Sequence, residues 1–386
     1  MVYRLMYYIV NVLLRVYFRR IYIDGLSNIP KDKALMIVCN HPMGFVEPIL
    51  MACLFPIDLN FLVRGDLFEN KLLKRFLLAT HQIPIYRFKD GFSSLRNNQE
   101  TMNYVVEVMK KKEALVIFIE GSTDMVMHLR PFKKGMARMA LQSLEADPNL
   151  EILVLPVGMT FSKGFMPLSE VAISVGKSFS INEIIKGEPE RDNINLISDT
   201  AYVAIKKHMV HLTNRKDEAV VQSHWDLHNA SKDPAFFPRA VKESGFIKDL
   251  KELEMSLNDS ELHDEKVKSI LDRRRGLNTK LPKAMVSGKK NYLGAILALM
   301  PGILGMVLYF IPIGVSLFLQ KKLVKQKEFV SAVIIASGGV LSLIWIMVIF
   351  IITWIFLGIL NAVLLLFLFF VSGISALYLL DFRHRI

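Results

Sequence analysis

The sequence predicts an α/β domain, layered around a mostly parallel sheet with helices on its faces, followed by membrane helices toward the C-terminus. Two observations predict the α/β part. Between residues 33 and 178, short apolar runs of strand length alternate with segments typical of helices. These runs are nearly continuous, as expected of strands with both faces covered. The apolar composition from residue 291 onward predicts the membrane helices.

The composition favours a lipid bilayer as partner. Hydrophobic residues make up 52% of the 386-residue chain, and the formal net charge is +12. A basic balance suits nucleic acid, anionic lipid surfaces or phosphorylated substrates, and the long apolar stretches favour lipid. The chain has no zinc-finger or RNP-like pattern, so we expect no nucleic-acid partner. Cys39 and Cys53 stand at no metal-ligand spacing, so we expect no metal, and a catalytic part facing a reducing cytosol.

Residues 1–25 are predicted to form an amphipathic helix in the membrane interface. Arg4, Arg15, Arg19 and Arg20 stand among aromatic and aliphatic residues, from where they would reach toward lipid head groups. A signal peptide would have an uncharged core and a small-residue cleavage site, and neither is evident. The alternative is an ordinary amphipathic helix packed on the domain.

Residues 26–215 are predicted to form the α/β domain. Its strands are expected at 34–40, 59–65, 83–87, 114–120, 151–161 and 171–177, and its helices at 46–55, 67–79, 93–112 and 133–145. Residues 216–290 are richer in charge and in helix formers. They are predicted to form a polar helical connector or a cap, with no chemistry assigned.

Residues 291–386 are predicted to form the membrane region. The run 329–380 carries no charged residue and is long enough for a helical hairpin that turns near Gly358 or Asn361. Residues 292–320, interrupted by two prolines, form either a re-entrant segment or a single tilted span. Basic flanks at 288–290, 321–327 and 383–385 prefer the cytoplasmic side. They favour the re-entrant arrangement and an integral membrane protein with its α/β domain on the cytoplasmic face.

His41 directly follows a predicted strand, and Glu47 follows six positions later. In a continuous helix six residues separate two side chains by about 240°, so this pair would not face each other. Pro42 and Gly44 favour a turn instead, which lets Glu47 swing back to a ring nitrogen. A carboxylate on one imidazole nitrogen fixes the tautomer and makes the other nitrogen a better base. The pair therefore predicts a general base, and the alternative is a structural histidine beside a strand.

Further polar groups stand near predicted strand ends. Glu120 ends a strand, Gly121 opens a turn, and Ser122 could cap a helix or donate to an oxygen. Lys133 and Lys134 stand at a helix start, where basic side chains and free backbone amides make an anion site. The alternatives are an ordinary strand turn and a solvated lysine pair.

Two more positions stand in or next to predicted strands. Arg87 lies just past a short strand, at the carboxyl end where ligands gather in α/β sheets, and its planar fork suits phosphate. Most arginines are simply solvated, which is the alternative. Pro156 interrupts an apolar run, which indicates an edge or an irregular strand that shapes a pocket wall.

In their order, these segments resemble the four blocks of the glycerolipid acyltransferase superfamily, which includes glycerol-3-phosphate and lysophosphatidic acid acyltransferases. The blocks are NHPMGFVE, IPIYR, FIEGST with PFKKG, and LPVG, over about residues 20 to 180. The resemblance implies that His41 is the general base on the acceptor hydroxyl and that Glu47 takes the place of an aspartate. Arg87, Glu120 and Gly121 match positions used for the glycerol phosphate. Pro156 matches the block linked to the acyl donor.

The chain departs from the usual family pattern at the acidic residue. Five residues separate His41 from Glu47, whereas the family has four between its histidine and aspartate. The longer spacing, with a small residue and serine in place of EGTR, resembles the branch of fungal-type glycerol-3-phosphate acyltransferases. Glutamate adds one methylene, so a longer arm must fold into the same gap. An inactive homologue is therefore an open alternative.

Together these features predict a membrane-bound O-acyltransferase of phospholipid synthesis. The acyl donor would be a thioester, acyl-CoA or acyl-ACP, and the acceptor glycerol 3-phosphate or a related phosphorylated glycerol. Arg87, Lys133 and Lys134 would hold the acceptor phosphate, and backbone amides would stabilise the oxyanion. No cofactor, metal or covalent enzyme intermediate is needed, and Cys39 is expected to be a buried small hydrophobe rather than a nucleophile. The alternatives are a lysophosphatidic acid or other lysophospholipid acyltransferase, and a non-catalytic lipid-binding membrane protein that has kept the fold.

Overall fold

The computed structural model describes residues 2–86, 98–185, 190–230, 232, 240–284 and 289–383. The strands are β1 Phe18–Asp24, β2 Ala34–Cys39, β3 Leu59–Arg64, β4 Gln82–Ile85, β5 Ala114–Phe118, β6 Ile152–Phe161, β7 Ser169–Val175, β8 Phe179–Ser180 and β9 Ala240–Lys242. The helices are α1 Val2–Tyr17, α2 Val46–Leu54, α3 Lys71–Ala79, α5 Asn98–Lys110, α6 Gly135–Ala146, α7 Ile181–Ile184, α8 Glu190–Lys206, α9 Glu218–Ala230, α10 Gly245–Asn258, α11 His263–Ala284, α12 Lys289–Leu308, α13 Phe310–Leu323, α14 Val330–Leu357 and α15 Ile359–Arg383.

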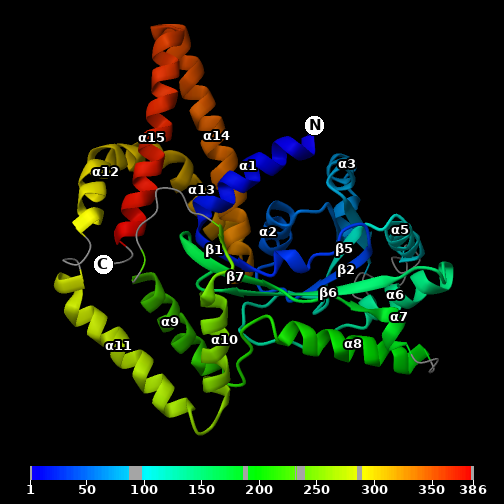
Figure 1. The fold of residues 1–386 in the computed structure, drawn as a ribbon. Helices are drawn as coiled ribbons and strands as arrows, with labels where there is room; N and C mark the ends of the chain where they lie inside the picture. Colours follow the sequence, from blue (N-terminus) through cyan, green and yellow to red (C-terminus); the bar gives the residue numbers. More distant parts are fainter. Residues whose placement is uncertain are drawn as a thin grey trace.

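All of these strands belong to one sheet. Their order is β4-β3-β5-β2-β6-β7-β1-β9, with β8 paired to β6 (Figure 1). Within the described ranges every pair is parallel except β6 with β7 and β6 with β8. The predicted fold class, a mostly parallel sheet flanked by helices and followed by apolar C-terminal helices, is confirmed.

Helices cover both faces of the sheet, and each face has its own core. Ile37 and Cys39 of β2 point to the core under α1 and α2, whereas Met36 and Val38 point to the core under α5, α6 and α8. This division follows from the alternation of side chains along a strand. Crossovers between parallel strands are right-handed, and the steps from β2 to β3 and from β3 to β4 run toward the same sheet edge. α3 therefore lies on the same face as α2, and α5 lies on the opposite face.

The predicted N-terminal helix over residues 1–25 ends earlier, at Tyr17, and the residues that follow form β1. The expectation that Arg19 and Arg20 reach toward lipid head groups is wrong, because both are buried. Arg19 Nε lies 2.6 Å from an Asp381 carboxylate oxygen, and Arg20 Nη1 lies 3.5 Å from a Glu170 carboxylate oxygen. Burying a charge is tolerated when it is paired, so these partners allow a strand to form where the arginines suggested an interfacial helix.

Residues 216–290 do more than connect the domain to the membrane region. β9 extends the sheet by pairing with β1, and α9 and α10 cover the β1–β7 part of one face. Trp225, Phe246 and Leu250 are buried there against Tyr22. The α/β layer therefore continues beyond residue 215, and the high average charge of this region concealed its apolar positions.

Pro156 lies in β6, which is an interior strand rather than an edge strand. On one side β6 pairs with β2 from Ile152 to Val157. On the other side β8 pairs with Leu153 and Val154, and β7 pairs from Val157 onward. Pro156 stands where the partner strand changes, so its missing N–H interrupts neither ladder. This agrees with the irregular-strand alternative and not with an edge.

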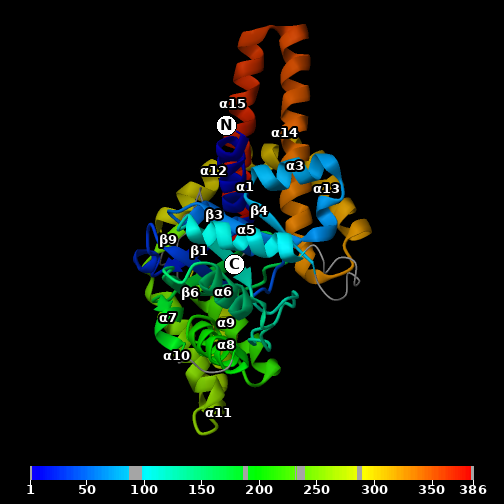
Figure 2. The same cartoon turned by 90° about the vertical axis from the view of Figure 1, so that its right-hand side faces the viewer.

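α14 and α15 form a hairpin that projects away from the sheet (Figures 1 and 2). Segments 327–357 and 359–381 are long and apolar enough to cross a membrane, and the turn between them falls at Gly358, as predicted. α12 and α13 meet at a bend of 55°, the geometry of either a broken span or a re-entrant loop. Both predicted arrangements of residues 292–320 fit this bend.

Candidate functional site

A buried asparagine fixes the end of β2. The Asn40 side chain donates to the Met159 carbonyl and accepts from the Met159 backbone N–H, both over 2.8 Å. These two bonds tie the residue before His41 to the neighbouring strand β6. The sequence assigned no role to Asn40, although its position directly before the histidine was visible.

The turn after β2 brings His41 and Glu47 together. Glu47 is fully buried in the first turn of α2, and its Oε1 lies 3.5 Å from His41 Nδ1. The same oxygen accepts a hydrogen bond from the Met43 backbone N–H. Nδ1 itself has no well-formed hydrogen bond among the described residues. The carboxylate therefore faces the ring at a distance too long for a good hydrogen bond to Nδ1. Hydrogen bonds of catalytic groups are often long before substrate binds.

The His41 ring is held in a partly open position. It stacks on the Phe118 ring with centroids 4.0 Å apart and planes 18° from parallel. The His41 side chain remains 17% exposed. An imidazole with one nitrogen facing a buried carboxylate and part of its surface accessible can act as a base, whereas a sealed ring could not reach a substrate.

Glu120 connects three segments of the site. It is buried two residues beyond β5, where one carboxylate oxygen accepts from the His41 backbone N–H over 3.1 Å. The other oxygen accepts from the Arg130 backbone N–H over 3.0 Å, and the Arg130 guanidinium donates to the carboxylate over 2.6 Å. Both oxygens are therefore engaged. These contacts make Glu120 a group that positions the His41 turn and Arg130.

Arg130 is a site residue that the sequence reasoning missed. Its guanidinium bridges Glu120 and Ser122, donating to the Ser122 hydroxyl over 2.8 Å and also to the Ser122 carbonyl. The side chain is 20% exposed, so a fixed cation borders the site. The residue stands in the segment LRPFKKG, where the lysine pair was the more evident anion-binding signal.

The two lysines of that segment point to different places. Gly121 has a positive φ of +70°, and a Cβ there would come within 2.9 Å of Lys133 Cγ, so the Lys133 stem crosses the Gly121 backbone. Lys134 instead donates from Nζ to the Asn195 side chain on α8 over 2.7 Å. The structure brings Gly121, Ser122 and Lys133 together beside Glu120 and turns Lys134 toward α8.

Two predicted site positions remain. Arg87 falls outside the described residues. Pro156 pairs with Val38 inside the sheet, on the face whose core α8 covers, whereas α2 covers the other face. Its role in binding the acyl donor stays a prediction.

Cys39 lies at the end of β2 and is fully buried. Burial, and then the negative charges of Glu47 and Glu120, raise the pKa of its thiol well above the usual value. Because only the thiolate is a good nucleophile, this environment agrees with a buried hydrophobe.

The base of the α14–α15 hairpin contacts the turn that carries His41. Gly44 has a φ of +70°, and a Cβ there would lie 2.9 Å from Cε1 of Phe329, the residue that precedes α14. The Phe45 and Phe329 rings have centroids 5.9 Å apart. Phe45 is itself exposed. The site therefore lies next to the point where the chain enters its candidate membrane spans.

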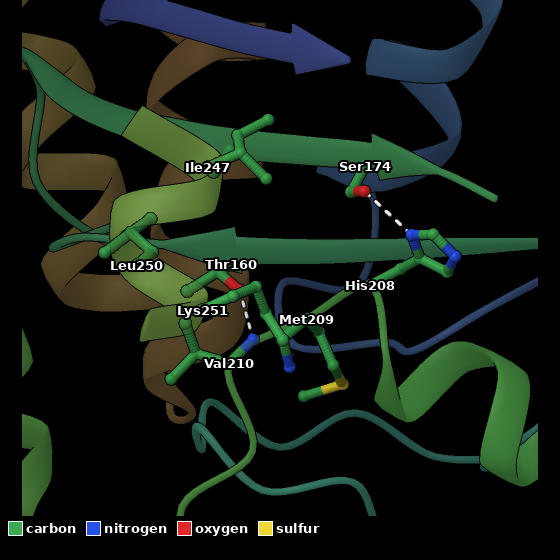
Figure 3. Close-up of a pocket in the computed structure, with 9 residues that line it drawn as sticks. Thr160, Ser174, His208, Met209, Val210, Ile247, Leu250 and Lys251 are labelled. Atoms are coloured by element: carbon green, nitrogen blue, oxygen red, sulfur yellow. Dashed lines mark hydrogen bonds between the residues drawn. The ribbon is translucent and has the colours of Figure 1, made fainter. Parts of the chain in front are cut away.

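A small cavity lies on the opposite face of the sheet, against α10 (Figure 3). The Ser174 hydroxyl and His208 Nδ1 are 2.8 Å apart there, and burial lowers the pKa of His208. The nearby Lys251 ammonium donates to the carbonyls of Lys206 and Met209 and to Glu254. The Lys251 ammonium is therefore hydrogen-bonded within the fold and is not available to a ligand. The cluster around His41, at the carboxyl ends of β2 and β5, is the stronger candidate site.

Comparison with known proteins bears on this cluster. Residues 20–160 match the family model described as Acyltransferase. The matched segment contains His41, Glu47, Glu120, Arg130 and Lys133. The match shows that this part of the chain is similar to acyltransferases.

Curated relatives agree with the family match. The chain is 28% identical over 118 residues to a 1-acyl-sn-glycerol-3-phosphate acyltransferase of Bacillus subtilis, across 30% of this chain and 53% of that protein. It is 24% identical over 184 residues to a protein of the same name in Borreliella burgdorferi, across 46% of this chain and 68% of that protein. The chain therefore spans about half the length of the first relative. Both relatives are thus named for acyl transfer to 1-acyl-sn-glycerol 3-phosphate, and the fungal-type branch stays a prediction.

A solved structure was also found to be similar. The 1-acyl-sn-glycerophosphate (LPA) acyltransferase PlsC of Thermotoga maritima has a TM-score of 0.37 and 15% sequence identity, over 52% of this chain and 78% of that chain.

Proposed function

We propose that this chain is a membrane-bound acyltransferase that moves a fatty acyl group from a thioester donor to a hydroxyl of a phosphorylated glycerol. The observation that carries the proposal is the buried Glu47 carboxylate 3.5 Å from His41 Nδ1, inside the segment that matches the Acyltransferase family. The contact between Phe329 and the same turn supports a reaction close to the membrane.

In the proposed reaction His41 is the base. Glu47 holds Nδ1 protonated and so leaves Nε2 free to take the proton of the acceptor hydroxyl. The acceptor oxygen attacks the thioester carbonyl, a C–O ester bond forms, and the C–S bond breaks. The leaving thiolate takes the proton back from His41. The cycle closes with no enzyme-bound acyl group, cofactor or metal.

The contacts narrow the choice of oxyanion donors. The backbone N–H of His41 is used by Glu120, and that of Met43 is used by Glu47. The Gly121 N–H donates to the Phe118 carbonyl over 3.2 Å. The predicted backbone donors must therefore come from other amides of the site. The Ser122 hydroxyl accepts from Arg130 and keeps its own proton free for donation.

The proposed phosphate site combines a fixed cation with a mobile one. Arg130 is held by Glu120 and Ser122, so its guanidinium loses little freedom when an anion binds. Lys133 crosses Gly121 and is exposed. Arg87 stays a predicted third contributor, and Lys134 is a weaker one because it binds Asn195. Holding the phosphate would convert attack by the neighbouring hydroxyl into a nearly intramolecular step.

Two acceptors have support. The names of the curated relatives and the position of the site beside Phe329 favour lysophosphatidic acid, whose acyl chain would lie in the bilayer. The spacing between His41 and Glu47 favours glycerol 3-phosphate, through its resemblance to the fungal-type branch. Placement of the α/β domain on the cytoplasmic face rests on the basic flanks, for example at 321–327.

The decisive experiment offers both acceptors to the purified full chain in vesicles, with labelled acyl-CoA and acyl-ACP in parallel reactions. We expect labelled lysophosphatidate or phosphatidate, identified by chromatography, and a loss of several orders of magnitude in the His41→Ala variant. Full activity in that variant would reject His41 as the base. Tight vesicle binding by the wild-type chain without transfer to either acceptor would favour the non-catalytic lipid-binding alternative.

A further inference from the structure

Helix α3 presents large apolar side chains to solvent. Leu72 is 78% exposed and Phe76 is 41% exposed, and Leu73 is also exposed. Leu77 is the buried residue of this helix. The helix is stable in this position because the Asn70 side chain caps it, accepting from the N–H groups of Leu72 and Leu73. A capped helix with most of its apolar surface uncovered needs a partner.

The charged residues of α3 lie on a separate side of the helix. At about 100° per residue, Leu72, Leu73 and Phe76 fall within an arc of about 100°, and the three cations fall on the other side. These cations are Lys71, Lys74 and Arg75. All three are exposed, and no acidic side chain pairs with them in the part of the chain that the structure describes. Leu78 is also exposed, between the cations.

The position of α3 relative to the hairpin shows what kind of surface it meets. The right-handed crossovers place α3 on the same sheet face as α2, and α1 packs on that face and contacts α14. Figures 1 and 2 both show α3 at the level of α1 and α12, on the side of the sheet toward which α14 and α15 project. A bilayer that held the hairpin would therefore meet α3 with its head-group region.

We propose that α3 lies in the interface of an anionic bilayer, the same one that the hairpin enters. Leu72 and Phe76 would reach the boundary with the acyl chains, and Lys71, Lys74 and Arg75 would contact lipid phosphates. An amphipathic helix with cations on its polar face binds such a surface through buried apolar area and attraction to anionic lipid. Three cations on the polar face of α3, none paired with an acidic side chain among the described residues, favour this partner over a second copy of the basic chain. The inference is independent of catalysis.

Site-directed spin labelling of the full chain tests the proposal without an activity assay. A nitroxide is attached to the Leu72→Cys variant and, as matched control, to Val203→Cys. Val203 is 53% exposed on α8, which packs on the opposite face of the sheet. The native Cys39 and Cys53 are buried, and the unmutated chain treated alike gives the background.

In vesicles of phosphatidylcholine with phosphatidylglycerol, we expect the label at 72 to be more accessible to oxygen than to a nickel chelate. The label at 203 should show the reverse. Equal accessibilities at the two positions would overturn the proposal. So would a label at 72 that is equally immobilised in detergent and in vesicles and that shows dipolar coupling to the label of a second chain, because a protein would then cover the helix.

The cations are tested in the same background. The accessibilities to oxygen and to the nickel chelate give the ratio of labels at 72 that are immersed in the bilayer to labels that are exposed to water. The triple variant Lys71→Gln/Lys74→Gln/Arg75→Gln should lower this ratio by about fivefold for each cation removed, at low salt. A control variant with Lys110→Gln, Lys111→Gln and Lys207→Gln removes as many exposed charges near α5 and α8, and should leave the ratio unchanged. An equal effect of the two triple variants, or no dependence on phosphatidylglycerol, would reject the anionic surface.

Discussion

Oε1 of Glu47 lies 3.5 Å from His41 Nδ1 while it accepts a hydrogen bond from the Met43 backbone N–H. The carboxylate is thus held by the turn it helps to close, and it stands in the first turn of α2, where the helix dipole favours a negative charge. The turn between His41 and Glu47 is one residue longer than in the family pattern, and the longer glutamate side chain spans the added distance. A glutamate in place of the family's aspartate is therefore compatible with a carboxylate facing the imidazole.

This geometry predicts that the charge of Glu47 matters more than its hydrogen-bonding capacity. Glu47→Gln keeps an oxygen that can accept from Met43 but loses the charge that stabilises a protonated ring, so we expect kcat to fall by about 10²–10⁴-fold. Glu47→Asp withdraws the carboxylate by one methylene and should retain partial activity. Steady-state kinetics of the thioester reaction measure both, with Glu145→Gln as a control on the exposed part of α6. A fully active Gln variant would contradict the assignment.

Arg130 is predicted to set the affinity for the acceptor phosphate. Arg130→Met removes the cation and leaves Glu120 buried without its ion pair, so KM for the acceptor should rise by about 10–100-fold and the protein should lose thermal stability. Arg130→Lys keeps the charge but cannot bridge Glu120 and Ser122 as a guanidinium does, so a smaller rise is expected. The exposed Arg138 on α6 supplies the control, Arg138→Met. An unchanged KM in both Arg130 variants would exclude it from the phosphate site.

The strand, turn and helix around His41 could be predicted because their signals are local. An apolar run, then Pro42 and Gly44, then an apolar helix follow one another within residues 34–54, and each has its own conformational preference. The same is true of the hairpin, where an uncharged run of sufficient length and Gly358 determine the outcome.

Contacts between distant segments could not be predicted in this way. Arg20 meets Glu170, 150 residues away, and this burial turned an apparent interfacial arginine into part of a strand. The Glu120–Arg130 pair closes a loop whose path no local pattern specifies. From the sequence alone, charged side chains are expected to be exposed to solvent, as most are. Pairing with a distant residue of opposite charge allows such a side chain to be buried instead.

Gly44 is predicted to couple the site turn to the membrane hairpin. Gly44→Ala imposes a side chain on a φ of +70° and brings a Cβ within 2.9 Å of Phe329, so two separate costs add. Phe329→Ala should relieve the contact and leave the backbone cost of about 1 kcal/mol. Thermal midpoints of the two single variants and the double variant in detergent give the coupling between the sites. Gly135→Ala, where a Cβ meets nothing within 4 Å, is the control. Strictly additive effects would show that the Phe329 ring does not restrain the turn.

The last prediction concerns acid stability and a histidine outside the site. Burial, with nearby Lys206 and His128, lowers the pKa of His211 to about 4, and its Nδ1 accepts from the Leu129 backbone N–H over 3.0 Å. The unfolded chain takes up this proton near pH 6.5, and the folded chain does so only near pH 4. Stability is therefore retained above pH 6.5 and falls as pH decreases toward 4, by up to about 1.4 kcal/mol per pH unit for one proton.

His211→Asn keeps an acceptor for Leu129 but cannot bind the proton, so its unfolding free energy should fall less steeply between pH 6.5 and 5 than that of the wild type. Other titrating groups cancel in this difference. His263→Asn serves as a control of opposite sign, because Asp264 and Asp217 raise the pKa of His263. The stability that His263 supplies is present below its unfolded pKa and is lost as pH rises, so its removal should weaken the protein more at pH 5 than at pH 8. Parallel curves for wild type and His211→Asn in detergent would show that this histidine already binds its proton in the folded state.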